Sequence, residues 1–120
     1  MINPDATKHS VGKALTAGTS NTLFTVPSGY HAYVTMVFIA NAGGSTAAVS
    51  AAWHDGATIT FQGDKSVSAG EAIQFGGDGE GLGLVMKSGD YMTVTPAAGS
   101  TFTAIATFEL FPHEASDVSF

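Results

Sequence analysis

The run GGDGEGLG, from Gly76 to Gly83, contains the residue types that most suggest a ligand site. Its glycines would let the backbone approach a phosphate closely, and Asp78 and Glu80, together with Asp64, offer oxygen ligands for Ca²⁺. The run does not open a helix after a strand, as a dinucleotide-binding loop does. Its carboxylates are too few, and their spacing matches no calcium loop. We therefore expect a plain connecting loop, with no cofactor and no metal ion.

Residues suited to acid–base or nucleophilic catalysis are present but do not form a recognisable set. His54 and Asp55 are adjacent, and adjacent residues of a strand point to opposite faces. The sequence has no cysteine and no Gly-x-Ser-x-Gly motif, so the usual nucleophiles are missing. The four histidines, which lack metal-ligand spacing, are His9, His31, His54 and His113. The sequence predicts a protein that is not an enzyme and has no catalytic residues.

The aromatic residues offer another kind of site, a platform on which a sugar could stack. Trp53 continues the alternating apolar face of Ala47, Val49 and Ala51, so we expect it in the core rather than in a platform. Tyr30 is expected in a turn and Tyr91 at the start of a strand. An exposed binding rim around these two tyrosines stays open as an alternative.

Composition excludes two classes of partner. Only 12% of the 120 residues are charged, and the net charge is −6. The basic residues are four scattered lysines, Lys8, Lys13, Lys65 and Lys87, which cannot form the basic patch that nucleic acid requires. The longest apolar run is Met36 to Ala40, far short of the ~20 residues of a spanning helix. The opening residues MINPDATKHS do not resemble a secretory signal. We expect neither a nucleic-acid partner nor a membrane partner.

The distribution of charge is uneven along the chain. No Asp, Glu, Lys or Arg occurs between Lys13 and Asp55, and none occurs from Tyr91 to Phe108. A free monomer usually keeps its surface charged. The long neutral segments therefore indicate either surface that is buried by a partner, or a Thr/Ser/Gly-rich β surface that is neutral yet hydrated.

Regular turn signals and alternating patterns predict an all-β protein, a single antiparallel β-sandwich of jelly-roll type with about eight short strands. Pro27-Ser28-Gly29, Asn41–Ser45, Asp55-Gly56 and Lys87–Asp90 are typical of tight turns. A further turn is expected at 63–66. The expected strands are 22–26, 31–40, 46–54, 57–62, 71–75, 84–86, 91–95 and 101–111. The expected organisation is an extended N-terminal arm (1–20), the sandwich (21–111) and a C-terminal tail (112–120).

Two of the expected strands have apolar residues on both faces. In the strand 31–40, Tyr33, Val37 and Ile39 fall on one face, and Ala32, Val34, Met36 and Phe38 fall on the other. In the strand 101–111, Phe102, Ala104, Ala106, Phe108 and Leu110 share one face, which leaves Ile105 and Phe111 on the opposite one. One face of a sandwich strand packs on the other sheet, so the second must be covered by a loop, an arm or another subunit. The predicted interface residues are Tyr33, Val37, Ile39, Ile105, Phe111 and, as a terminal aromatic anchor, Phe120.

The sequence from Thr22 to Asn41, TLFTVPSGYHAYVTMVFIAN, resembles the opening hairpin of small β-sandwich proteins from tailed-bacteriophage particles. The shared pattern is a strand, Val-Pro-x-Gly, a longer apolar strand, then Asn followed by small residues. SAGEAIQF, LGLVMKSGDYMTVTPA and TAIATFEL resemble later strands of the same proteins, so the resemblance covers most of residues 22–111.

The resemblance implies a structural role in a virion, on the capsid or the tail surface. The leading hypothesis is a capsid decoration (cement) protein, a homo-oligomer and most simply a trimer, that binds the major capsid protein and stabilises the head. A tail-fibre or spike component, or a receptor-binding module for glycans, is the alternative.

Overall fold

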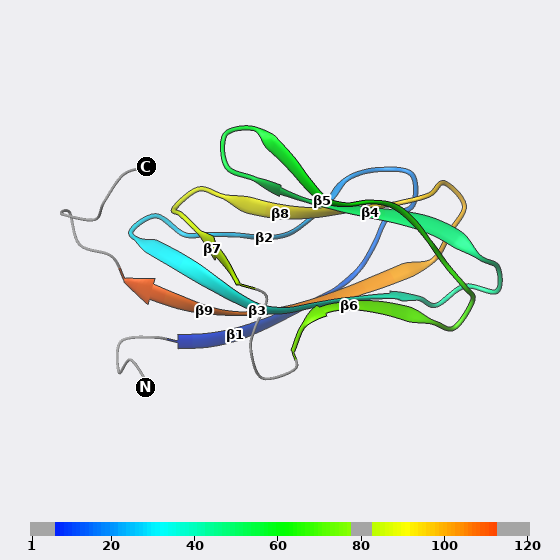
Figure 1. Ribbon diagram of the computed structural model, residues 1–120, viewed down its shortest axis with the longest axis horizontal. Coiled ribbons are helices and arrows are strands. Elements are labelled where there is room, and N and C mark those ends of the chain that lie inside the picture. Colours follow the sequence, from blue (N-terminus) through cyan, green and yellow to red (C-terminus); the bar gives the residue numbers. More distant parts are fainter. Residues whose placement is uncertain (1–6, 78–82, 113–120) are drawn as a thin grey trace.

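The chain folds into two antiparallel β-sheets packed face to face (Figure 1). The computed structural model describes residues 7–77 and 83–112, and this part of the chain holds nine strands and no helix. They are β1 (Thr7–Ala14), β2 (Asn21–Thr25), β3 (Tyr30–Asn41), β4 (Ala47–His54), β5 (Thr58–Val67), β6 (Ala72–Gly76), β7 (Leu84–Met86), β8 (Tyr91–Pro96) and β9 (Phe102–Pro112). Sheet A has the order β1-β9-β3-β6, with β7 also paired to β3, and sheet B has the order β2-β8-β4-β5. The predicted all-β antiparallel sandwich is confirmed.

Glycine-containing turns set the ends of the strands, as predicted. After β2 the Tyr30 N–H donates to the Pro27 carbonyl at 3.2 Å, and Gly29 between them has φ 85°. After β7 the Asp90 N–H donates to the Lys87 carbonyl at 3.0 Å. Glycine suits a turn at positive φ because it has no Cβ to clash with the backbone.

Two predicted segments differ from the structure. Within the expected arm, Thr7–Ala14 is strand β1, which pairs with β9 through eight consecutive residue pairs. Its side chains are mostly exposed, so the segment lacks the apolar alternation that marks a half-buried strand. The turn expected at 63–66 is also wrong, because these residues lie inside β5, where the register against β4 shifts twice. The polar, glycine-containing sequence there produces bulges instead of a reversal.

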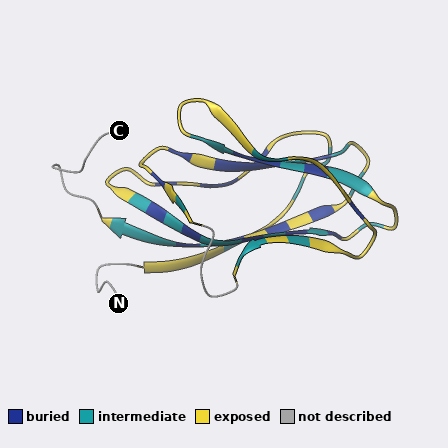
Figure 2. Cartoon of the chain, in the orientation of Figure 1, coloured by how far each residue is buried: buried dark blue, intermediate teal, exposed yellow. Residues whose placement is uncertain are grey.

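The core lies between the sheets and is built from alternate residues of the strands (Figure 2). In β9 the inward residues are Phe102, Ala104, Ala106 and Phe108, each at most 5% exposed, as the alternation predicted. The Phe108 ring stacks on Phe24 of β2 at a centroid distance of 4.0 Å, which joins the two sheets.

A β-bulge in the central strand β3 changes which residues face the core. Val34 lies opposite Phe108, but Met36 lies opposite Thr107, so β3 has one extra residue, Thr35, against β9. The Thr35 hydroxyl donates to the Thr107 carbonyl at 2.9 Å, and the Thr35 carbonyl accepts the Gly77 N–H at 2.9 Å. These hydrogen bonds hold the bulge to β9 on one side and to Gly77, the residue after β6, on the other.

The bulge reverses the alternation along β3. Ala32 and Val34 face the core before it, and Val37 and Ile39 face the core after it, all fully buried. Met36, Phe38 and Ala40 consequently point to the outside of sheet A and are half-buried. The prediction that Val37 and Ile39 share an outer face with Tyr33 is therefore wrong, because an unbroken period of two does not hold across residue 35.

This face assignment predicts a large difference between two neighbouring substitutions. Ile39→Ala should lower the free energy of unfolding by about 2–5 kcal/mol, since it opens a cavity in the core. Phe38→Thr should lower it by less than about 1 kcal/mol, since Phe38 lies on the outer face. Urea denaturation of both variants measures the two values. Equal losses, or a larger loss for Phe38→Thr, would contradict the assignment.

Candidate interaction surface

The outer face of sheet A is laid out in rows across the strands by the register of the sheet. Directly opposed residues share a face, so the rows follow from the pairs of β1, β9 and β3 and of β3 with β6 or β7. From one end of the sheet to the other they are Lys8–Glu109–Tyr33–Val85, Ser10–Thr107–Met36, Gly12–Ile105–Phe38–Gln74 and Ala14–Thr103–Ala40–Ala72. We call these residues, with the pair His31–Phe111 beyond the first row, the outer face of sheet A.

This outer face carries exposed aliphatic side chains and little charge, together with the hydroxyls of Ser10, Thr103 and Thr107. Val85 is 54% exposed and Ile105 is 42% exposed, although both are large aliphatic residues. Within the four rows the only Asp, Glu, Lys or Arg residues are Lys8 and Glu109, which lie directly opposite one another. Opposite charges in that position attract one another across the strands.

The outside of sheet B has a different chemistry. Its rows contain Thr22–Thr93–Ala52–Thr60 and the group Thr25–Tyr91–His54–Thr58. Hydroxyl groups and an imidazole make this surface polar although it carries little charge. Thr22, Thr25, Thr58 and Thr60 are exposed, so the hydrated Thr-rich reading of the neutral segments fits these parts of sheet B, whereas the exposed aliphatic residues of sheet A fit the other reading.

The structure distributes the predicted interface residues among three places. Tyr33 and Phe111 are half-buried and Ile105 is exposed, and all three lie on the outer face of sheet A. Val37 and Ile39 are in the core, as described above. Phe120 lies outside the described residues.

Sequence reasoning missed three apolar members of this face. An unbroken alternation places Met36 and Phe38 on the face opposite Tyr33, and the bulge at Thr35 moves them to the same face. Val85 lies in a strand of three residues, too short for its alternation to be read. Phe111 has a partner on its own face, since its ring stacks on His31 at 5.3 Å with an interplanar angle of 9°.

His54 is held among hydroxyl groups rather than beside a carboxylate. Its Nε2 lies 2.8 Å from the Thr93 hydroxyl and its Nδ1 lies 3.2 Å from the Thr58 hydroxyl. The ring stacks on Tyr91, with centroids 4.3 Å apart and an angle of 6° between the planes. Both ring nitrogens thus lie within hydrogen-bonding distance of threonine hydroxyls. The His54 and Tyr91 rings form a stacked pair, and Tyr91 in that pair is exposed.

Asp90 is buried and has a structural role. One carboxylate oxygen, Oδ2, accepts the Lys87 N–H at 2.9 Å and the Trp53 Nε1–H at 3.2 Å. The first bond closes the turn between β7 and β8, since an Asp side chain can accept a hydrogen bond from a nearby turn amide. The second ties that turn to β4. Trp53 itself is half-buried and packs against the core, so its ring is not a free platform.

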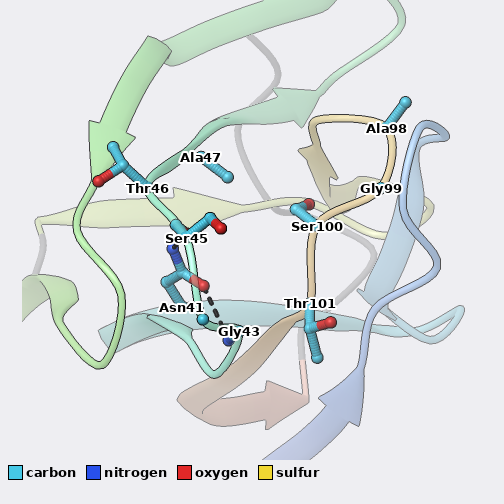
Figure 3. A pocket seen from close by; sticks show the side chains of 10 residues that line it. Asn41, Gly43, Ser45, Thr46, Ala47, Ala98, Gly99, Ser100 and Thr101 are labelled. Carbon is cyan, nitrogen blue, oxygen red and sulfur yellow. Dashed lines mark hydrogen bonds between the residues drawn. The ribbon is translucent and has the colours of Figure 1, made fainter.

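A polar hollow of about 280 Å³ lies at one end of the sandwich, between the β3–β4 and β8–β9 loops (Figure 3). Asn41 at its base is 1% exposed. Its Nδ2 donates to the carbonyls of Ser45 and Val67, and its Oδ1 accepts the Gly43 N–H. The amide is therefore committed to holding the loop, and the remaining lining of glycine, serine, threonine and alanine carries no charge.

A smaller apolar pocket of about 230 Å³ is lined by Trp53, Phe61, Gly83 and Leu84 at the open edge between the sheets.

Within the described residues no group of three or more His, Asp or Glu side chains is placed to hold a metal ion. The same residues include no helix of the length and hydrophobicity needed to cross a membrane.

Comparison with known proteins shows a likeness of fold. No family model matches the chain, and none of the curated proteins compared with it matches. A solved structure of Bacillus endospore appendages, described as a novel family of disulfide-linked pili, superposes with a TM-score of 0.55. The likeness covers 91% of this chain and 88% of that one, at 12% identity. At that identity the likeness shows the fold alone.

The two hydrogen bonds of Asp90 make a prediction for stability. Asp90→Ala should lower the free energy of unfolding by about 2 kcal/mol, because two N–H donors lose a buried acceptor. Trp53 fluorescence should shift to the red as water reaches the indole. Glu109→Ala, on the outer face, is the control and should change the stability by no more than about 0.5 kcal/mol. An unchanged midpoint and spectrum for Asp90→Ala would contradict the role.

Proposed function

We propose that this chain is a non-enzymatic structural protein of a tailed-bacteriophage particle, and that it decorates the capsid surface. The outer face of sheet A is the observation that carries the proposal. It presents Ile105, Phe38 and Val85 from three different strands, with a single pair of opposite charges. A face that combines exposed aliphatic side chains with so little charge is suited to burial against a partner.

The energetics of such a contact suit a repeated lattice. Burying apolar surface contributes about 25 cal/mol per Å², so a few half-exposed side chains on each copy give a weak contact. Where copies are joined in an oligomer, the contacts of its subunits act together through multivalency, so the oligomer leaves the shell more slowly than a single copy would. The major capsid protein is the proposed partner, and the resemblance of residues 22–111 to phage β-sandwich proteins supports that choice.

The fold likeness supports an assembled role in general terms. The similar solved structure is of pili, in which subunits form a larger object. Those pili are disulfide-linked, whereas this sequence has no cysteine, so the proposed assembly does not use disulfides between these residues. An enzymatic role is not proposed, because His54 and Asp90 are engaged by threonine hydroxyls and by N–H donors, respectively.

The stacked pair of His54 and Tyr91 supports a second candidate function, a glycan-binding module of a tail fibre or spike. Tyr91 is 37% exposed, and a shallow pocket of about 160 Å³ adjoins it, also lined by Gly56, Ala57 and Thr58. In that case the outside of sheet B would bind the glycan, and the outer face of sheet A would pack on other fibre proteins.

Binding of variants to particles that lack this protein tests the proposal. The double variant Phe38→Lys/Ile105→Lys should bind at least about tenfold more weakly, because two buried charges would need desolvation. Thr22→Lys/Thr60→Lys adds the same charge on sheet B and should bind as the unmodified chain does. Co-sedimentation with the particles, followed by reconstruction from electron micrographs, measures the binding and its location.

Density over the capsid lattice supports decoration. Density at the tail tip would overturn decoration in favour of the glycan-binding candidate. Normal binding by Phe38→Lys/Ile105→Lys together with loss of binding by Thr22→Lys/Thr60→Lys would reverse the assignment of the two faces.

A further inference from the structure

The edges of the two sheets differ in how far they are protected against pairing with another strand. In β2 the register shifts between Thr22 and Phe24, and the Lys13 Nζ donates to the Thr22 carbonyl at 2.7 Å. In β5 two register shifts interrupt the strand. In β6 the Gln74 side chain donates to the Gly76 carbonyl at 2.8 Å, and β7 has three residues. Bulges, lysines and short strands are the usual protections of edges.

Strand β1 is less protected than these edges, because it has no bulge and because one of its two lysines, Lys13, bonds to the Thr22 carbonyl of β2, which leaves Lys8. It is the terminal strand of sheet A, and its eight residues pair with β9 without a register shift. It contains no proline, and seven of the eight residues are exposed. Among the described strands it is the longest edge that runs unbroken.

The hydrogen bonds of β1 show which of its backbone groups point outward. The Leu15 N–H donates to the Phe102 carbonyl at 2.9 Å, directly beyond the last β1–β9 pair, Ala14 with Thr103. In an antiparallel ladder, hydrogen-bonded and non-hydrogen-bonded pairs alternate. The odd-numbered residues of β1 therefore bond to β9, and the N–H and C=O groups of Lys8, Ser10, Gly12 and Ala14 point away from the sheet.

We propose that β1 is a self-association site, at which β1 of a second copy pairs antiparallel to extend sheet A across a two-fold axis. The outward residues can pair fully in one register, with Val11 opposite Val11 of the second copy. Lys8 then lies opposite Ala14 and Ser10 opposite Gly12, so each of the four outward residues exchanges two hydrogen bonds with its opposite.

Charge and side-chain size are compatible with this register. Lys8 faces Ala14, and Lys13 faces His9, so no two lysines are directly opposed, an arrangement that would be unfavourable. Gly12 leaves space at the centre, since a Cβ placed there would meet nothing within 4 Å. A second register, with Ser10 opposite Ser10, matches fewer of the described outward residues.

The pairing has a consequence for the outer face of sheet A. A two-fold axis perpendicular to the sheet keeps both outer faces on the same side, so two copies present their apolar residues on one surface, joined through Lys8, Ser10, Gly12 and Ala14 of each β1. The proposal does not depend on the phage role, because it rests on β1 alone. It differs from the trimer that the phage resemblance implies, since a two-fold edge joins copies in pairs.

Gly12→Pro and Gly12→Ala form a matched test. Proline at position 12 removes an outward N–H and leaves the ladder to β9 intact, and Gly12 is not at positive φ, so a side chain is tolerated there. Sedimentation equilibrium at concentrations up to about 1 mM should show a dimer for the unmodified chain and for Gly12→Ala. Association of Gly12→Pro should be at least about tenfold weaker. Thermal melting checks that both variants stay folded.

Single cysteines in this cysteine-free chain test the register. Val11→Cys places two thiols opposite one another, with Cα atoms about 4.5 Å apart, which is within disulfide range. Oxidation with diamide should therefore give a covalent dimer much faster for Val11→Cys than for Ser10→Cys. Ser10→Cys should form a covalent dimer as slowly as the control variant, Thr58→Cys on β5.

Each contrary result overturns one part of the proposal, either the pairing through β1 or its register. A monomer or trimer for the unmodified chain, or an unchanged dimer for Gly12→Pro, would overturn pairing through β1. Faster cross-linking of Ser10→Cys would overturn the register. Loss of particle binding with an intact dimer would concern the proposed function and not this site.

Discussion

The β-bulge at Thr35 is the constraint on which the surface chemistry of this protein depends. Strand β3 lies in the middle of sheet A, and its apolar residues are too many for one face of a regular strand. One extra residue changes the alternation, so that Ala32 and Val34 on one side of the bulge and Val37 and Ile39 on the other all reach the core. The same change turns Met36 and Phe38 outward.

Gly77 shows how closely the bulge is supported from outside β3. Its N–H donates to the Thr35 carbonyl. It has φ 82°, and a Cβ there would come within 2.9 Å of Met36 Cγ and 2.7 Å of Gln74 Nε2. A larger residue would therefore be strained in backbone and in packing. The end of β6 and the bulge in β3 form one local arrangement, which exposes the apolar outer face.

The sequence predicts the elements well where local chemistry decides them. Pro27 and Gly29 set a turn by themselves, and β9 alternates without interruption, so Phe102 and Phe108 were placed correctly. The phase change in β3 was not predictable from its own residues, because it depends on Thr107 and Gly77, which are distant in the sequence. Strand β1 was missed since an edge strand with exposed side chains has no apolar period. Of the residues on the outer face of sheet A, the sequence predicts Tyr33, Ile105 and Phe111, and it does not predict Met36, Phe38 and Val85.

The central claim is that the outer face of sheet A, and not that of sheet B, is buried in the assembled protein. Hydroxyl-radical footprinting with mass spectrometry compares side-chain reactivity in the assembled particle and in the isolated chain. The account predicts that assembly protects Met36 and Phe38 several-fold and leaves the exposed ring of Tyr91 as reactive as before. Unchanged reactivity at Met36 and Phe38, together with protection of Tyr91, would contradict it.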